Sequence, residues 1–190
     1  MLERLIALLR ARSYQKRDVI LASGARSDFF VDCKQTVLTA EGHRLVGELM
    51  YGALGVFGGC DAVAGVELGG CPLASAVSLT SALHARQPAE QKRGVQALDA
   101  LYVRKEPKDH GTQKLVEGDK SLRLGGRVAL LEDVITTGGS TLAAIAKLED
   151  AGAKVVGVVV LVDREEGGRE AIEARGFRVV SIVRKSDLVD

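Results

Sequence analysis

The sequence is poor in cysteine, proline, aromatic residues and net charge. It has three cysteines (Cys33, Cys60 and Cys71), three prolines, no tryptophan and 4% aromatic residues among 190. The odd number of cysteines argues against a closed disulfide framework, and their spacing does not match a set of metal ligands. We therefore expect the protein to be located in the reducing cytoplasm. The formal net charge of +1 argues against nucleic acid as a partner. No apolar run reaches the ~18 residues that span a bilayer, so we expect no membrane partner either.

The residues that are present favour one globular domain. Hydrophobic residues make up 46% and charged residues 27% of the chain. Glycine is abundant, 22 of 190 residues or about 12%, against a typical ~7%. A chain of this length buries roughly 70% of its unfolded surface, enough for one sizeable core. We therefore expect a single domain over residues 1–190.

Helical and strand patterns alternate along the chain. The residues after the first helix, as far as Asp28, are polar and predict irregular structure. Apolar strands are bounded by turns and followed by amphipathic helices, which predicts an α/β fold with a central, mostly parallel sheet flanked by helices. The expected helices are about 1–11, 40–54, 72–85 and 139–151. The expected strands are about 29–33, 61–66, 98–104, 127–131, 155–162 and 177–183.

The segment 105–121, KEPKDHGTQKLVEGDKS, interrupts this pattern. It has no helical or strand period and is longer than most structureless connections in compact domains. One interpretation is a solvated loop without function. The other is a lid that closes over an anion, because Lys105, Lys108, His110 and Lys114 gather in it.

The most informative segment is Val128–Thr141, VALLEDVITTGGST. An apolar strand leads to two adjacent carboxylates, Glu132 and Asp133, and then to the glycine- and hydroxyl-rich run Thr136–Thr141 before a helix. Glycines allow a close approach of the backbone to an anion, and the first N–H groups of a helix point at it. Carboxylates do not bind phosphate, but they accept hydrogen bonds from sugar hydroxyls. This combination at the carboxyl end of a parallel strand fits a sugar phosphate; a capped turn with two solvated acids is the alternative.

The segment LLEDVITTGGST resembles the ribose-phosphate signature of the type I phosphoribosyltransferases. Three further segments resemble the orotate phosphoribosyltransferase family within it: ASGARSDFFVDCK at 22–34, RKEPKDHG at 104–111 and VDRE at 162–165. They lie in the family's order and cover most of the chain. Together they are specific, whereas each of the three alone is weak.

The resemblance implies a type I phosphoribosyltransferase fold, with a small hood contributed by about residues 1–35 and a mobile catalytic loop at 105–121. It implies Mg²⁺-dependent transfer of a phosphoribosyl group from 5-phosphoribosyl 1-pyrophosphate to orotate, which gives orotidine 5′-monophosphate and pyrophosphate in de novo pyrimidine biosynthesis. It also implies a homodimer with shared active sites. Magnesium would be held mainly by substrate, with no direct protein ligand set.

The resemblance also implies roles for individual residues. Glu132, Asp133, Lys108 and His110 would be catalytic. Arg104, Lys105, Lys108, His110, Leu68 and Gly69 would lie on the pyrophosphate side, Thr136, Thr137, Gly138, Gly139, Ser140 and Thr141 would bind the ribose 5′-phosphate, and Phe29, Phe30, Lys34, Thr136 and Arg164 would bind orotate.

Alternatives remain at several of these residues. Phe29 and Phe30 also fit a plain core strand, and Arg164 also fits a surface ion pair with Glu165 or Glu166. Ala22 stands where some family members carry a lysine, and Leu68 and Gly69 stand where some carry another. The chain as a whole also fits a phosphoribosyltransferase for another base, or a non-catalytic regulator that senses the phosphoribosyl donor.

Overall fold

The computed structural model describes residues 1–20, 26–106 and 114–189. Its centre is a six-stranded sheet in the order β5-β4-β3-β6-β7-β8. The strands β3, β4, β6, β7 and β8 run parallel, and β5 is antiparallel to β4. Their bounds are β3 Ala62–Val66, β4 Asp99–Val103, β5 Val116–Glu117, β6 Arg127–Ile135, β7 Lys154–Asp163 and β8 Val179–Arg184. The expected fold class, α/β with a mostly parallel sheet, is confirmed.

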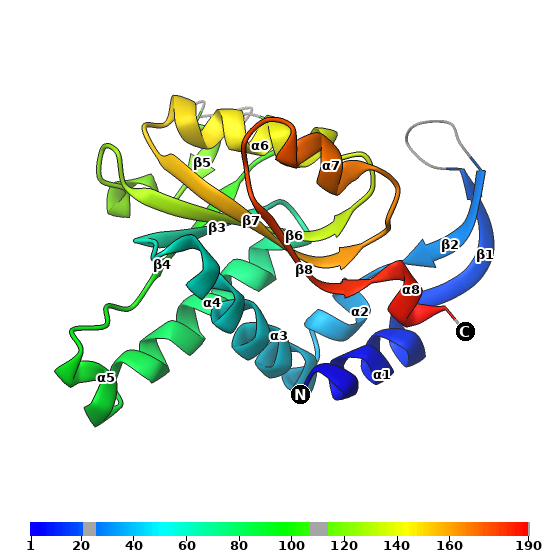
Figure 1. Cartoon of the computed structure of the whole chain (residues 1–190), viewed down its shortest axis with the longest axis horizontal. Coiled ribbons are helices and arrows are strands. Elements are labelled where there is room, and N and C mark those ends of the chain that lie inside the picture. The colour runs from blue at the N-terminus through cyan, green and yellow to red at the C-terminus, as the bar shows by residue number, and fades with distance from the viewer. Residues whose placement is uncertain (21–25, 107–113, 190) are drawn as a thin grey trace.

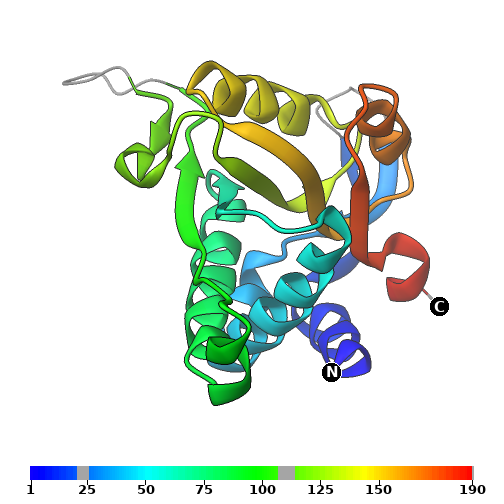
Figure 2. The same ribbon diagram turned by 60° about the vertical axis from the view of Figure 1, so that its left-hand side comes forward.

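Helices cover both faces of this sheet (Figure 1). The helices α1, α3 and α4 lie on one side, and α6 and α7 lie on the other, as the turned view also shows (Figure 2). The helices span α1 Leu2–Arg12, α2 Lys34–Val37, α3 Ala40–Ala53, α4 Gly70–Ala85, α5 Pro88–Lys92, α6 Gly139–Asp150, α7 Gly168–Glu173 and α8 Lys185–Leu188, with short 3-10 turns at Leu54–Phe57 and Asp119–Ser121. Among the described residues, no helix is both long and apolar enough to cross a bilayer.

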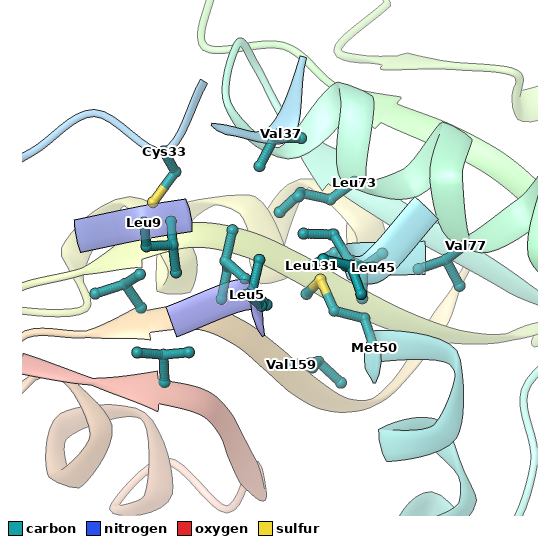
Figure 3. Packing of buried hydrophobic residues seen from close by; sticks show 14 of the residues in the cluster. Leu5, Leu9, Cys33, Val37, Leu45, Met50, Leu73, Val77, Leu131 and Val159 are labelled. Atoms are coloured by element: carbon teal, nitrogen blue, oxygen red, sulfur yellow. The ribbon is translucent and has the colours of Figure 1, made fainter. Parts of the chain in front are cut away.

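The central strands divide their side chains between two cores. Alternate residues of a strand point to opposite faces. In β6, Ala129 and Leu131 therefore join the core beneath α1, α3 and α4, whereas Val128 and Leu130 join the core beneath α6. Figure 3 shows the first core, in which Leu131 lies among Leu45 and other side chains from the covering helices. Burial on both faces explains why β7 reads as an almost continuous apolar run.

The sequence pattern predicted irregular structure in the polar stretch after α1, and this prediction is wrong. The stretch contains β1, Tyr14–Ile20, which pairs antiparallel with β2, Arg26–Val31, in a separate two-stranded sheet. Backbone hydrogen bonds hold this pair together, so it needs no apolar alternation. Its base is tied to the body of the protein, because the Arg164 guanidinium at the end of β7 donates to the Phe29 carbonyl at 3.1 Å.

Candidate active site

The two adjacent acids lie within β6, which continues past them to Ile135 instead of ending at Leu131 as expected. Glu132 is buried, with 5% of its surface exposed, and its Oε2 accepts a hydrogen bond from Thr141 Oγ1 at 3.0 Å. Asp133 is only half-buried. The two acids therefore differ in their access to solvent: Asp133 is partly exposed, whereas Glu132 is buried.

Burial, with the neighbouring Asp133 charge as a smaller cause, raises the pKa of Glu132 to about 8 against the opposing effect of the Thr141 hydrogen bond. Glu132 is consequently protonated at neutral pH and can donate as well as accept a hydrogen bond. The Thr141 hydroxyl, expected to bind phosphate, is directed to Glu132 instead, so this part of the expectation is corrected.

The protonated state of Glu132 predicts a pH dependence of stability. The folded protein keeps this proton up to about pH 8, whereas an unfolded chain releases it near the ordinary value of 4.5. The unfolded state therefore binds fewer protons across this window, and stability falls as the pH rises, by up to about 1.4 kcal/mol per pH unit. Glu132→Gln removes this titration. Urea unfolding between pH 5 and 8 should show a shallower decline for Glu132→Gln than for the parent.

The exposed Glu149→Gln on α6 is the matched control for that measurement. It should follow the parent. Identical slopes for the parent and Glu132→Gln would show that Glu132 is ionised in the folded protein.

The phosphate-loop candidate, Thr136–Thr141, joins β6 to α6. Gly138 stands before the first residue of the helix with φ +81°, a conformation that side chains rarely adopt. A Cβ at Gly138 would also lie 2.8 Å from the Gly168 carbonyl oxygen. Gly139 differs, because nothing described lies within 4 Å of a Cβ built there. The loop thus presents the N-terminus of a 12-residue helix to open space, as an anion site requires.

Substitutions in this loop should separate backbone approach from side-chain donation. Gly139→Val fits the fold, since its side chain enters open space, but it occupies the space beside the helix N-terminus. Thr137→Ala removes one hydroxyl from an exposed position. We expect Gly139→Val to weaken binding of the phosphoribosyl donor by more than tenfold, and Thr137→Ala by less, since one neutral hydrogen bond contributes about 1 kcal/mol. Titration calorimetry measures both; equal affinities in the two variants and the parent would contradict the assignment.

The loop after β3 reaches the same acids. The peptide between Glu67 and Leu68 is cis, and Leu68 is 71% exposed. A Cβ at Gly69 would overlap the Asp133 carboxylate. A side chain at position 69 would therefore shift the Asp133 carboxylate from its present place.

The first residues of the proposed catalytic loop lie beside this loop. The Arg104 amide donates to the Leu115 carbonyl at 2.8 Å, and the Lys105 amide donates to the Glu67 carboxylate. The Arg104 guanidinium lies 3.9 Å from Glu117. Lys108 and His110 lie outside the described residues, as does Ala22.

The candidate base-binding residues separate into two groups. Phe29 is fully buried, with its ring 5.1 Å from that of Tyr14, so it offers no face to a ligand and its alternative as a core residue fits. Phe30 is half-buried, and the Arg17 guanidinium lies 3.7 Å from its ring centroid. Phe30 is thus the one of the pair that retains access.

The charged candidates on this side both have carboxylate neighbours. Arg164 is buried and forms an ion pair with Glu166 at 3.0 Å, so the pair is not at the surface as its alternative supposed. Lys34 lies 2.6 Å from Asp32. The hydrogen bond to Asp32 raises the pKa of Lys34, and the Asp133 charge adds to the shift. Lys34 therefore places a positive charge close enough to Asp133 for the two charges to interact.

Two contributors escaped the sequence reasoning. The sequence assigns Glu67 no role, yet its carboxylate accepts a hydrogen bond from the Lys105 amide at the start of the proposed catalytic loop. Lys147 on α6 contacts the same region from the other side. Neither residue follows a motif, and only the packing of distant segments brings them together.

The donor chemistry of this site fits a hard cation such as Mg²⁺. In the part of the chain that the structure describes, no group of three or more His, Cys, Asp or Glu could hold a metal ion by itself. Mg²⁺ is often bound by one or two carboxylates and by substrate phosphates. The half-buried Asp133 provides one such carboxylate oxygen.

The strand, the acid pair and the loop at the start of α6 form the arrangement that the sequence predicts for a sugar-phosphate site. A family model described as "Phosphoribosyl transferase domain" matches residues 37–187, so the chain belongs to the phosphoribosyltransferase family. This confirms the resemblance drawn from LLEDVITTGGST.

Within this family, the chain is similar over most of its length to orotate phosphoribosyltransferases. The orotate phosphoribosyltransferase of Sorangium cellulosum (strain So ce56) is 64% identical over 98% of this chain and 92% of its own length. That of Bradyrhizobium sp. (strain ORS 278) is 42% identical over 92% of this chain and 89% of its own. Among solved structures, Mycobacterium tuberculosis H37Rv orotate phosphoribosyltransferase with Fe(III) dicitrate superposes with a TM-score of 0.78 at 36% identity, covering 98% of each chain. The same enzyme in complex with 5-phospho-α-D-ribosyl 1-diphosphate gives 0.74 at 33% identity, again covering 98% of each chain.

Proposed function

We propose that the protein transfers the phosphoribosyl group of 5-phosphoribosyl 1-pyrophosphate to orotate, in de novo pyrimidine biosynthesis. A bond forms between orotate N1 and the ribose C1, the C1–oxygen bond to pyrophosphate breaks, and the proton lost by orotate N1 is taken up by the released pyrophosphate. The products are orotidine 5′-monophosphate and pyrophosphate. The observation that carries the proposal is the acid pair of β6 followed at once by a loop at the N-terminus of α6, in a chain 64% identical to an orotate phosphoribosyltransferase.

The site residues divide the substrate between them. Asp133 accepts from the ribose hydroxyls, and protonated Glu132 supports it from behind. Thr136–Ser140 and the backbone of Thr141 bind the 5′-phosphate. Leu68 and Gly69 bring backbone to the pyrophosphate side, and Phe30, Lys34, Thr136 and Arg164 surround orotate. The positively charged groups that bind the pyrophosphate are Arg104, Lys105, Lys108 and His110.

The chemistry needs stabilisation of charge more than a protein nucleophile. Positive charge develops on the ribose ring and negative charge on the leaving pyrophosphate as the bond breaks. Fixed groups of opposite sign stabilise these charges without reorganising during the reaction. Asp133 lies on the ribose side, and the cations of the segment 104–110 serve the leaving group. Mg²⁺, held mainly by the substrate phosphates, would neutralise pyrophosphate charge.

We further propose that residues 1–190 act as one domain in the cytoplasm, with residues 1–35 as its hood and 105–121 as its catalytic loop.

The proposed active form is a homodimer. Large apolar side chains on and before α4 support a second copy as the partner: Leu68 is 71%, Leu79 57% and Leu83 55% exposed. Leu79 and Leu83 are four residues apart and share one helix face. Two-fold dimers are the commonest soluble oligomers.

The direct test measures magnesium-dependent consumption of orotate with the phosphoribosyl donor. Parallel assays replace orotate by uracil, hypoxanthine or adenine. We expect turnover with orotate, and its loss when a chelator removes Mg²⁺. Turnover of a purine but not of orotate would favour the other-base alternative, and a tight, salt-dependent nucleic-acid complex without turnover would favour the regulator.

A further inference from the structure

Lys147 links the helix of the phosphate loop to the start of the proposed catalytic loop. Its Nζ donates to the Arg104 carbonyl at 2.9 Å and to the Lys105 carbonyl at 2.8 Å. Lys147 lies two turns into α6, which begins at Gly139, whereas Arg104 directly follows β4. One side chain therefore joins two segments that are 42 and 43 residues apart in the sequence.

The two ends of one peptide group are held by opposite charges. The Arg104 carbonyl accepts from the Lys147 ammonium, and the Lys105 amide, in the same peptide group, donates to the Glu67 carboxylate. Because a peptide group is planar, fixing both its oxygen and its N–H fixes the plane. Hydrogen bonds with one ionised partner are roughly twice as strong as neutral ones. The plane contains the Cα atoms of Arg104 and Lys105, so fixing it fixes the points from which the two side chains leave the backbone.

Glu67 is itself anchored to the sheet. Its amide donates to the Val103 carbonyl at 2.9 Å, at the end of β4. The loop that approaches Asp133, the end of β4 and the helix of the phosphate loop thus meet at the 104–105 peptide. A cavity of about 210 Å³ lies here between Val66, Val103, Ser140 and Lys147. Arg104, Lys105 and Lys147 line this cavity together.

We propose that Lys147, opposed by Glu67, is a positioning residue that orients Arg104 and Lys105 toward the pyrophosphate. The proposal rests on the proposed function, which assigns those two cations to pyrophosphate. Lys147 acts through the backbone of its neighbours. Its loss therefore weakens binding of the leaving group and leaves the 5′-phosphate loop unchanged.

The variants are Lys147→Met, which keeps the length of the side chain without its charge, and Lys147→Arg, which can still donate to two carbonyls. Lys154→Met is the matched control, because Lys154 is exposed at the amino end of β7 and loses the same charge. Calorimetry measures the affinity for pyrophosphate with Mg²⁺ and for ribose 5-phosphate. Hydrogen exchange measures protection of the segment that contains the Lys105 amide. Thermal unfolding verifies that each variant folds.

We expect Lys147→Met to weaken pyrophosphate binding about tenfold, the scale of one lost charge-assisted hydrogen bond, with ribose 5-phosphate binding within twofold of the parent. Exchange at the Lys105 amide should accelerate in the same variant. Lys147→Arg should restore most of both properties, and Lys154→Met should change neither.

Unchanged pyrophosphate affinity and unchanged exchange in Lys147→Met would overturn the proposal, and so would equal losses for pyrophosphate and ribose 5-phosphate. Accelerated exchange with unchanged pyrophosphate affinity would overturn the positioning of the two cations. Failure of the proposed function is seen separately, as a parent that binds pyrophosphate but does not consume orotate. In that case the same difference between variants would still support the role of Lys147.

Discussion

Asp133→Asn is expected to lower turnover with orotate by roughly 10²–10³-fold, the loss typical when one preorganised electrostatic group is removed from an active site. The change keeps the shape of the side chain and removes its charge. Asp133 is half-buried and lies against the backbone of Gly69, so asparagine fits the same space. Without the charge, nothing at this position balances the positive charge that develops on the ribose.

The measurement is kcat at saturating orotate and phosphoribosyl donor, with thermal unfolding as the test of folding. Asp150→Asn, at the exposed end of α6, is the matched control and should retain the parent's rate. An unchanged rate in Asp133→Asn would make Asp133 a structural carboxylate. The ribose-binding role would then have to belong to Glu132 alone, despite its burial.

Lys108→Ala is expected to lower kcat by roughly 10²-fold and to weaken donor binding much less, because pyrophosphate gains negative charge mainly in the transition state. Lys108 lies outside the described residues, but the segment that carries it begins at Lys105, beside the loop that approaches Asp133. Exclusion of water around the leaving group would strengthen the effect of the lysine charge. Single-turnover kinetics and equilibrium binding of the donor separate the two quantities. Equal losses in both would show that Lys108 binds the donor in the ground state.

A mixing experiment tests whether the active site is shared in the proposed dimer. Lys108→Ala chains and Asp133→Asn chains are each nearly inactive by the two predictions above. If Lys108 of one copy serves the Asp133 of the other, each mixed dimer contains one site with both residues intact, and activity returns. Absence of recovery after verified subunit exchange would mean that each chain supplies both residues of its own site. A fully active monomer in sedimentation would exclude sharing.

The succession of buried strands and covering helices could be predicted from the sequence because it depends on local periodicity. Each of the expected strands 61–66, 127–131 and 155–162 is present, with boundaries shifted by a few residues. The shift at β6 matters most, since its pairing with β7 continues to Ile135 and places both acids inside the sheet. The β1 strand could not be predicted, because most of its residues are polar and its pairing partner is a separate segment, β2.

The amino-acid sequence by itself determined the α/β class, the position of the acid pair and the run TTGGST, since these depend on residue type and spacing over a few neighbours. Only the tertiary structure decided which of two adjacent residues of the same kind is buried and which stays accessible. Glu132 and Asp133 are adjacent acids, yet Glu132 is buried and burial raises its pKa to about 8, whereas Asp133 stays half-exposed. Phe29 is buried and Phe30 is not. Lys147 reaches the Arg104 carbonyl across 43 residues. Burial and contacts between distant segments depend on how the elements pack, and no local pattern in the chain encodes them.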